Sequence, residues 1–101
     1  MNDSVIVVGA GGHAKVVIST VLAAGMSIAA IYDDDREKWG CKISGFNVSG
    51  PLTMIDDIEG QSAIIAVGDN LSRNKIALRF NKLKWVNVVH PSAFVHPSVR
   101  L

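Results

Sequence analysis

Residues 4–14 read SVIVVGAGGHA, an apolar and mostly β-branched run that passes directly into a glycine-rich turn. The run at Ser4–Val8 is typical of a strand buried on both faces of a parallel sheet. A helix is expected over Ala14–Ala24, with Gly25 as its C-cap, and SIAAIY at Ser27–Tyr32 indicates a second buried strand. Strand, helix and strand joined by short connections predict a right-handed crossover, and therefore the α/β class with a parallel sheet.

The rest of the chain continues this alternation less regularly. Residues 36–50 contain three glycines and are expected to form an irregular excursion, with a short edge strand at Phe46–Val48. The remaining expected elements are a helical turn in Thr53–Ile58, a strand over Ala63–Val67, a helix over Leu71–Leu83 with Ile76, Phe80 and Leu83 on one stripe, and a strand over Trp85–Val89. The sequence thus predicts a small open parallel sheet of about four strands within residues 1–89.

Composition limits the function classes. The 101 residues are 49% hydrophobic and 19% charged, as expected for one small globular domain. Ten Lys+Arg against nine Asp+Glu leave a net charge of +1, so we expect neither a nucleic acid nor a membrane as partner. A basic signal-peptide region is missing and no apolar run approaches about 18 residues, which favours the cytoplasm. The single Cys41 and the lack of zinc-type spacing predict no disulfide and no metal site.

The turn GAGGHA after the first strand matches the dinucleotide fingerprint G-x-G-x-x-G/A through Gly9, Gly11 and Ala14. Glycines let a phosphate approach the backbone, and the N-terminus of the following helix offers unpaired N–H groups. The fold indicated is therefore Rossmann-like, although a glycine turn required only for packing would give the same letters. His13 could hydrogen-bond a ligand or merely cap the turn.

Two further loops follow predicted strands. DDD at residues 33–35 stands about 20 residues beyond the glycine turn, where a dinucleotide fold places an acid for the ribose, although a solvated turn is the alternative. AVGDN at residues 66–70 repeats the strand–glycine pattern, with Asp69 or Asn70 expected to cap the second helix. Arg73, in the first turn of that helix, is the basic residue best placed to reach a phosphate. Ligands of open α/β sheets bind at the edge where such loops gather.

The last twelve residues, HPSAFVHPSVRL, repeat a six-residue phrase. A hexapeptide period indicates a parallel β-helix, and such coils need roughly three or more repeats to be stable. We therefore expect residues 90–101 to be the start of a β-helix in a longer protein. The alternative is a proline-punctuated tail that repeats by chance.

Together these motifs resemble bacterial sugar O-acyltransferases of the sialic acid O-acetyltransferase family, and the N-acetyltransferases that make bacillosamine-type 4-amino sugars are similar. The resemblance is carried by GAGGHAKVV, YDDD, AVGDN with NLSRNKI, and HPSAFVHPSV, in this order and spacing. It implies an N-terminal Rossmann-like domain that holds a UDP-linked amino sugar. It also implies a left-handed β-helix domain, missing here, that binds acetyl-CoA, supplies the catalytic histidine and builds a homotrimer.

The resemblance also assigns roles to residues of this chain. Gly11, Gly12 and His13, beside Gly9, would line the phosphate and sugar side. Asp33 and Asp34 would hold the nucleoside end, and Val67, Gly68 and Asp69 would form the facing wall, with Arg73 near the phosphate. His90 and His96 lie in the entry repeats and are not assigned as the catalytic base. No residue here is expected to be catalytic, so the chain would bind without catalysis and need no cofactor, as a monomer or weak dimer.

Two rival interpretations remain open from the sequence. An NAD-binding module would explain the glycine turn and the later acid, but it leaves the terminal repeat without a role and lacks a second mononucleotide half. A non-catalytic regulatory domain that binds no nucleotide is the other.

Overall fold

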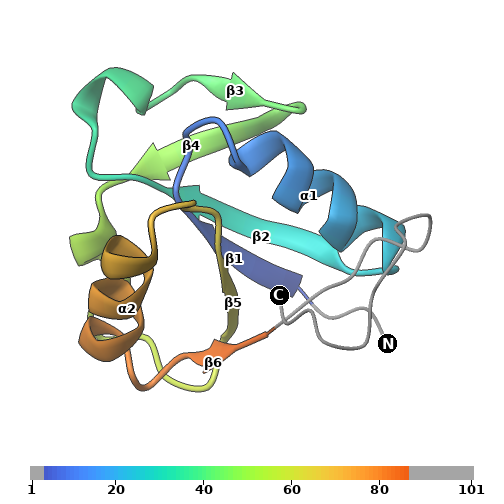
Figure 1. Ribbon diagram of the computed structural model, residues 1–101. Coiled ribbons are helices and arrows are strands. Elements are labelled where there is room, and N and C mark those ends of the chain that lie inside the picture. The colour runs from blue at the N-terminus through green and yellow to red at the C-terminus, as the bar shows by residue number, and fades with distance from the viewer. Residues whose placement is uncertain (1–3, 87–101) are drawn as a thin grey trace.

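The computed structural model describes residues 4–86 and shows an α/β domain built on one mostly parallel sheet (Figure 1). The predicted β-helix start at residues 90–101 lies outside the described residues, as does most of the last predicted strand. The strands are β1 (Ser4–Val8), β2 (Ser27–Tyr32), β3 (Lys42–Ile43), β4 (Phe46–Gly50), β5 (Ser62–Ile65) and β6 (Lys84–Trp85). Their order across the sheet is β3-β4-β2-β1-β5-β6.

Helices α1 (Ala14–Ala23) and α2 (Asn70–Arg79) cover opposite faces of this sheet (Figure 1). Two 3₁₀ turns, η1 (Arg36–Lys38) and η2 (Leu52–Ile55), follow β2 and β4. No helix within residues 4–86 is long and apolar enough to cross a membrane.

Strand β1 is the centre of both cores. Val7 packs with Ile18 of α1, whereas Ile6 and Val8 pack on the other face with η2, Phe80 and the residues around α2. Successive side chains of a strand point to opposite faces, so an uninterrupted apolar run is what burial on both faces requires. The prediction of β1 as a doubly buried strand is confirmed, and β2 has the predicted bounds.

Helix α1 ends one residue before the predicted position, at a glycine-dependent cap. Gly25 has a φ of +82°, and its N–H bonds Leu22 O while the Met26 N–H bonds Val21 O. This pair of bonds is the Schellman motif, which needs a left-handed residue and so favours glycine. The predicted role of Gly25 is confirmed.

The sheet has more strands than predicted. The excursion after β2 contains two strands in place of one, because residues 42–50 form a hairpin whose two-residue turn places Ser44 at φ +52° and Gly45 at +89°. Strand β4 is not at the edge: it pairs in parallel with β2, where Ile31 faces Val48, and β3 covers its outer side. The expected sheet of about four strands is therefore a sheet of six, five of them parallel.

Helix α2 is shorter than the predicted Leu71–Leu83. It stops at Arg79 because Phe80 leaves helical geometry, with φ −109° and ψ +54°. Phe80 and Leu83 are nevertheless both buried in the core face shared with Val8. The apolar stripe was predicted correctly, but its last part lies on a turn that leads into β6.

Candidate functional site

The chain changes direction beside β1. After β1 it builds β2 and then β4 on one side, and it afterwards crosses to the other side to form β5 and β6. The loops after β1 and β5 therefore leave the same edge of the sheet toward helices on opposite faces (Figure 1). Such a switch point opens a crevice at the carboxyl ends of the strands, where ligands of open α/β sheets bind.

A small cleft lies at this edge and has a volume of ≈ 140 Å³. Its lining consists of Val8, Gly9, Asp33, Asp34, Leu52, Val67 and Ile76. Four of these are residues that the sequence assigned to a site, and they come from the loops after β1, β2 and β5. Val8, Leu52 and Ile76 were not assigned, because an aliphatic residue outside a strand-end loop carries no functional signal in a sequence; only the fold brings them here.

The glycines of the first loop differ in what they do. Gly9 is buried with a φ of +114°, and a Cβ there would stand 2.9 Å from Val67 Cγ2 and 3.0 Å from Ala66 O. Gly9 is thus required for the close approach of the two loops. Gly11 and Gly12 are exposed, lack positive φ, and a Cβ on either would meet no atom within 4 Å. Packing therefore accounts for Gly9 alone, and the other two face open space.

His13 occupies the N-cap position of α1 without capping it. Its side chain accepts no hydrogen bond from the helix, and the first turn contains no acidic residue. The imidazole instead lies against Gly68 in the loop after β5, where a Cβ would overlap its Nε2. Of the two roles open to His13, the side-chain cap is excluded by this geometry. The Ala14 N–H donates to Gly11 O at 3.0 Å, but the next two N–H groups of the first turn have no backbone partner within residues 4–86, and the positive end of the helix dipole is available to an anion.

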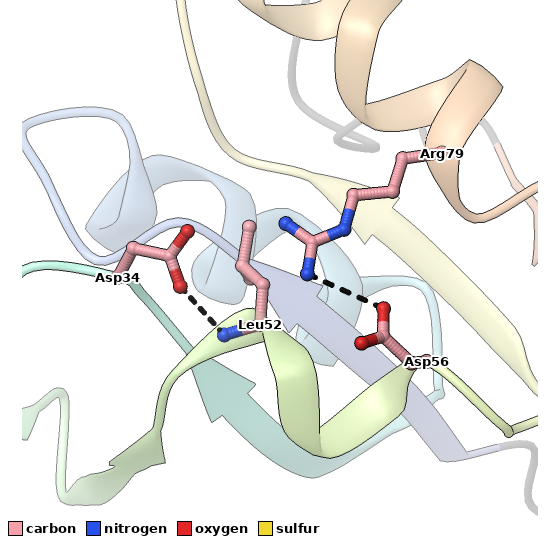
Figure 2. A network of polar contacts seen from close by, with 4 residues as sticks. All are labelled: Asp34, Leu52, Asp56 and Arg79. Atoms are coloured by element: carbon pink, nitrogen blue, oxygen red, sulfur yellow. Dashed lines mark hydrogen bonds and ion pairs between the residues drawn. The ribbon is translucent and has the colours of Figure 1, made fainter.

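Asp33, Asp34 and Asp35 separate in the structure. Asp33 is half-buried at the cleft and its Oδ2 accepts a hydrogen bond from the Ala10 N–H at 2.7 Å. Asp34 is exposed, also lines the cleft, and its Oδ1 accepts from Leu52 N at 2.8 Å (Figure 2). Asp35 does not line the cleft, and its side chain caps η1. Two of the three aspartates thus line the cleft.

The remaining assigned residues gather at the start of α2. Asp69 is its N-cap and accepts a hydrogen bond from Ser72 N at 2.8 Å. Hydrogen bonds from Ser72, first through its side chain and then through its backbone, lower the pKa of Asp69, and Lys75 adds a smaller effect in the same direction. The Asp69 carboxylate is therefore used to cap α2. Arg73 turns back to donate from Nη1 to Val67 O at 3.3 Å, which places its guanidinium at the loop that borders the cleft.

The fold thus brings Gly9, Asp33, Asp34 and Val67 together around one cleft, with His13 packed against Gly68 close by in the chain. The lining does not include Gly11, Gly12, Gly68, Asp69 or Arg73. Among residues 4–86, no group of three or more His, Cys, Asp and Glu is arranged to hold a metal ion.

The model of the PglD N-terminal domain family matches residues 4–80. Perosamine N-acetyltransferase from Caulobacter crescentus, solved as an H141N mutant with CoA and GDP-perosamine, superimposes with a TM-score of 0.76 at 36% identity, over 96% of this chain and 47% of that one. The acetyltransferase domain of PglB from Neisseria gonorrhoeae gives a TM-score of 0.73 at 32% identity, over 96% of this chain and 49% of that one. Uncharacterized protein L142 of Acanthamoeba polyphaga mimivirus is 36% identical over 90 residues, which are 89% of this chain and 18% of that protein. The chain therefore spans about half the length of the two acetyltransferase structures it matches.

Proposed function

Because this chain belongs to the PglD N-terminal domain family, we propose that it is the nucleotide-sugar-binding domain of a sugar acetyltransferase. The observation that carries the proposal is the cleft at the switch point, where the glycine loop after β1, the carboxylates after β2 and the loop after β5 meet. Each of these parts has a ligand group that suits it: a phosphate for the glycine loop and the open N-terminus of α1, and hydroxyl or N–H donors for the carboxylates.

The cleft is too small to hold the whole ligand. At ≈ 140 Å³ it is smaller than the roughly 300–1,000 Å³ of pockets that enclose a drug-sized ligand. The cleft would take the nucleoside, with Leu52, Val67 and Ile76 as its apolar walls. The diphosphate would then lie over Gly11 and Gly12, and Arg73 would reach it from the side of the loop after β5. The sugar would extend past His13 into the open side of the edge.

The ligand class is a nucleoside diphosphate sugar. The family resemblance implies UDP and the Caulobacter relative was solved with GDP-perosamine, so both bases are compared in the titration. Acetyl transfer, the acetyl-CoA site and any trimer belong in this proposal to the rest of the enzyme, and this domain acts as the acceptor-binding part.

Titration of the ¹⁵N-labelled chain with GDP, UDP and NAD tests the proposal. We expect saturable amide shifts at Gly9, Gly11, Gly12 and Gly68 with GDP or UDP, and weaker or no shifts with NAD. A stronger response to NAD would favour a dinucleotide-binding module. A folded protein that responds to none of the three would contradict the proposal and favour a domain without a nucleotide ligand. The control variant is Asp57→Asn, at an exposed position outside the cleft lining, which should give the same nucleotide response as the unsubstituted chain.

A further inference from the structure

Asp33 is bonded through every polar group it has. Its Oδ2 accepts a hydrogen bond from Ala10 N at 2.7 Å, and its Oδ1 accepts one from Asp35 N at 2.8 Å. Its own N–H donates to Gly50 O at 2.9 Å, and its carbonyl oxygen accepts from the Trp39 indole N–H at 2.7 Å. This one residue therefore joins the glycine loop, the end of β4 and the turn after β2.

The bond to Ala10 is the one that matters for the ligand. It joins residues 23 positions apart, and Ala10 is only 3% exposed, so an Ala10 N–H that lost this acceptor would be left largely buried. The preceding amide is tied as well, since Gly9 N donates to Tyr32 O at 2.8 Å. Two successive amides of the loop are thus held by the end of β2. The direction in which the chain continues into Gly11 and Gly12 depends on these two bonds.

Asp34 differs from its neighbour in each of these respects. It is exposed, and only one of its carboxylate oxygens is used, by Leu52 N at 2.8 Å (Figure 2). Its Oδ2 accepts no hydrogen bond from any residue between 4 and 86. Since Asp34 also lines the cleft, this oxygen can accept a donor without breaking a bond of the fold.

We propose that Asp33 is a positioning residue, which sets the course of the glycine loop for a phosphate, whereas Asp34 accepts a hydrogen bond from the nucleoside. This division rests on the proposed function and assigns different tasks to two adjacent, chemically identical side chains. A carboxylate beside a phosphate site repels the anion, so the charge of Asp33 disfavours the ligand that its hydrogen bonds prepare for. Removing the charge and losing the positioning therefore have opposite effects on anion binding.

Three asparagine variants of the full chain separate these effects. Asp33→Asn keeps one acceptor oxygen and turns an NH₂ donor toward a backbone N–H, so either Ala10 or Asp35 loses its partner. Asp34→Asn can keep the bond to Leu52 N and lose only the free carboxylate oxygen. Asp35→Asn is the control, because it removes the same charge from the same turn at a residue outside the cleft lining. Inorganic pyrophosphate and GDP are the probes.

We expect Asp33→Asn to bind pyrophosphate several-fold more weakly than Asp35→Asn, although both lose one negative charge. Asp34→Asn should bind pyrophosphate as Asp35→Asn does and GDP about tenfold more weakly, the loss of one hydrogen bond to a charged group. A comparison of GDP with 2′-deoxy-GDP identifies the donor. If the ribose 2′-hydroxyl donates to Asp34, the wild type should bind 2′-deoxy-GDP about tenfold more weakly than GDP, whereas Asp34→Asn should bind the two ligands equally. If both ligands show the tenfold loss in Asp34→Asn, the donor is another group of the nucleoside.

The ligand-free protein provides an independent measurement. The Ala10 amide of the wild type should exchange its hydrogen more slowly than those of Gly11 and Gly12, and in Asp33→Asn its signal should shift and its exchange accelerate. Asp34→Asn should leave it unchanged. If Asp33→Asn does not fold, the wild-type exchange rates decide the question.

Each half of the inference can be overturned separately. Pyrophosphate binding by Asp33→Asn that equals or exceeds that of Asp35→Asn, or an Ala10 amide that exchanges as fast as that of Gly11, would contradict the role of Asp33. Equal GDP affinity of Asp34→Asn and Asp35→Asn would contradict the role of Asp34. Failure of the wild type to bind either probe would overturn the proposed function and the role of Asp34, while the exchange of the Ala10 amide still tests Asp33.

Discussion

Helices α1 and α2 are each ten residues long, and each follows a strand and a glycine-containing loop at the same edge of the sheet. They are held in opposite ways. Helix α1 buries Ala14, Ile18, Thr20 and Val21, and its N-terminus has no side-chain cap. Helix α2 buries no residue and leaves Leu71 and Leu78 exposed, but its N-terminus is capped by Asp69.

The difference indicates which helix has an N-terminus open to a ligand. Because packing against the sheet holds α1, its first turn needs no cap and stays open to an anion. Helix α2 depends more on its ends, where Asp69 bonds Ser72 N and Arg79 lies 3.3 Å from Asp56 in an exposed ion pair (Figure 2). One of its N-terminal N–H groups, that of Ser72, is already bonded to a carboxylate. Of the two loops of similar sequence pattern, we therefore expect the one before α1 to bind an anion.

The largest expected effect is on the packing that holds α1. Ile18→Ala removes a fully buried side chain from the core and should lower the free energy of unfolding by about 3 kcal/mol. Ile76→Ala, its counterpart on α2, removes a half-buried side chain and should cost about 1 kcal/mol. Urea denaturation of both variants measures the difference. Equal losses would mean that α2 is packed as firmly as α1 and would break the comparison.

The next effect separates the two kinds of glycine in the first loop. Gly9→Ala forces a Cβ into a left-handed position against Val67 and Ala66, and should destabilise the protein by on the order of 2 kcal/mol. Gly12→Ala meets open space and should leave stability unchanged within about 0.5 kcal/mol, while its methyl group weakens nucleotide binding at the open end of α1.

Thermal unfolding and a GDP titration of both glycine variants check this pair. A Gly12→Ala protein that binds GDP as the wild type does would remove this glycine from the site.

The smallest effect belongs to the cap of α2. Hydrogen bonds from Ser72 lower the pKa of Asp69 in the folded protein below its ordinary value. The ionised cap therefore stabilises the fold fully above the ordinary pKa, and this contribution is lost as the pH falls through the lowered one. Asp69→Asn should therefore be slightly less stable than the wild type at neutral pH, and the difference should vanish in acid. Unfolding curves from pH 7 to pH 2 measure it. A difference that persists at the lowest pH would show that the charge is not what the cap contributes.

The central strands and both helices were predictable because their signals are local. A β-branched run of five residues at Ser4–Val8 has few alternatives to a buried strand, and Gly25 marks the end of α1 through its own backbone preference. The hairpin of β3 and β4 was not predicted in full, since β3 has only two residues and its turn carries Ser44 in a left-handed conformation. Its partner strand β2 is chosen by contacts that no local pattern contains.

The amino-acid sequence alone was sufficient for the α/β class, the glycine turn before α1 and the carboxylates after β2, because each depends on neighbours along the chain. Only the tertiary structure decided that Leu52 and Ile76 wall the cleft, that the His13 ring rests on Gly68, and that Asp33 is bound to Ala10 while Asp34 keeps an oxygen free. The physical reason is that hydrogen bonds and packing act over a few ångströms in space. Residues far apart in the chain, or adjacent ones of the same type, acquire their tasks when the sheet brings their partners within that distance.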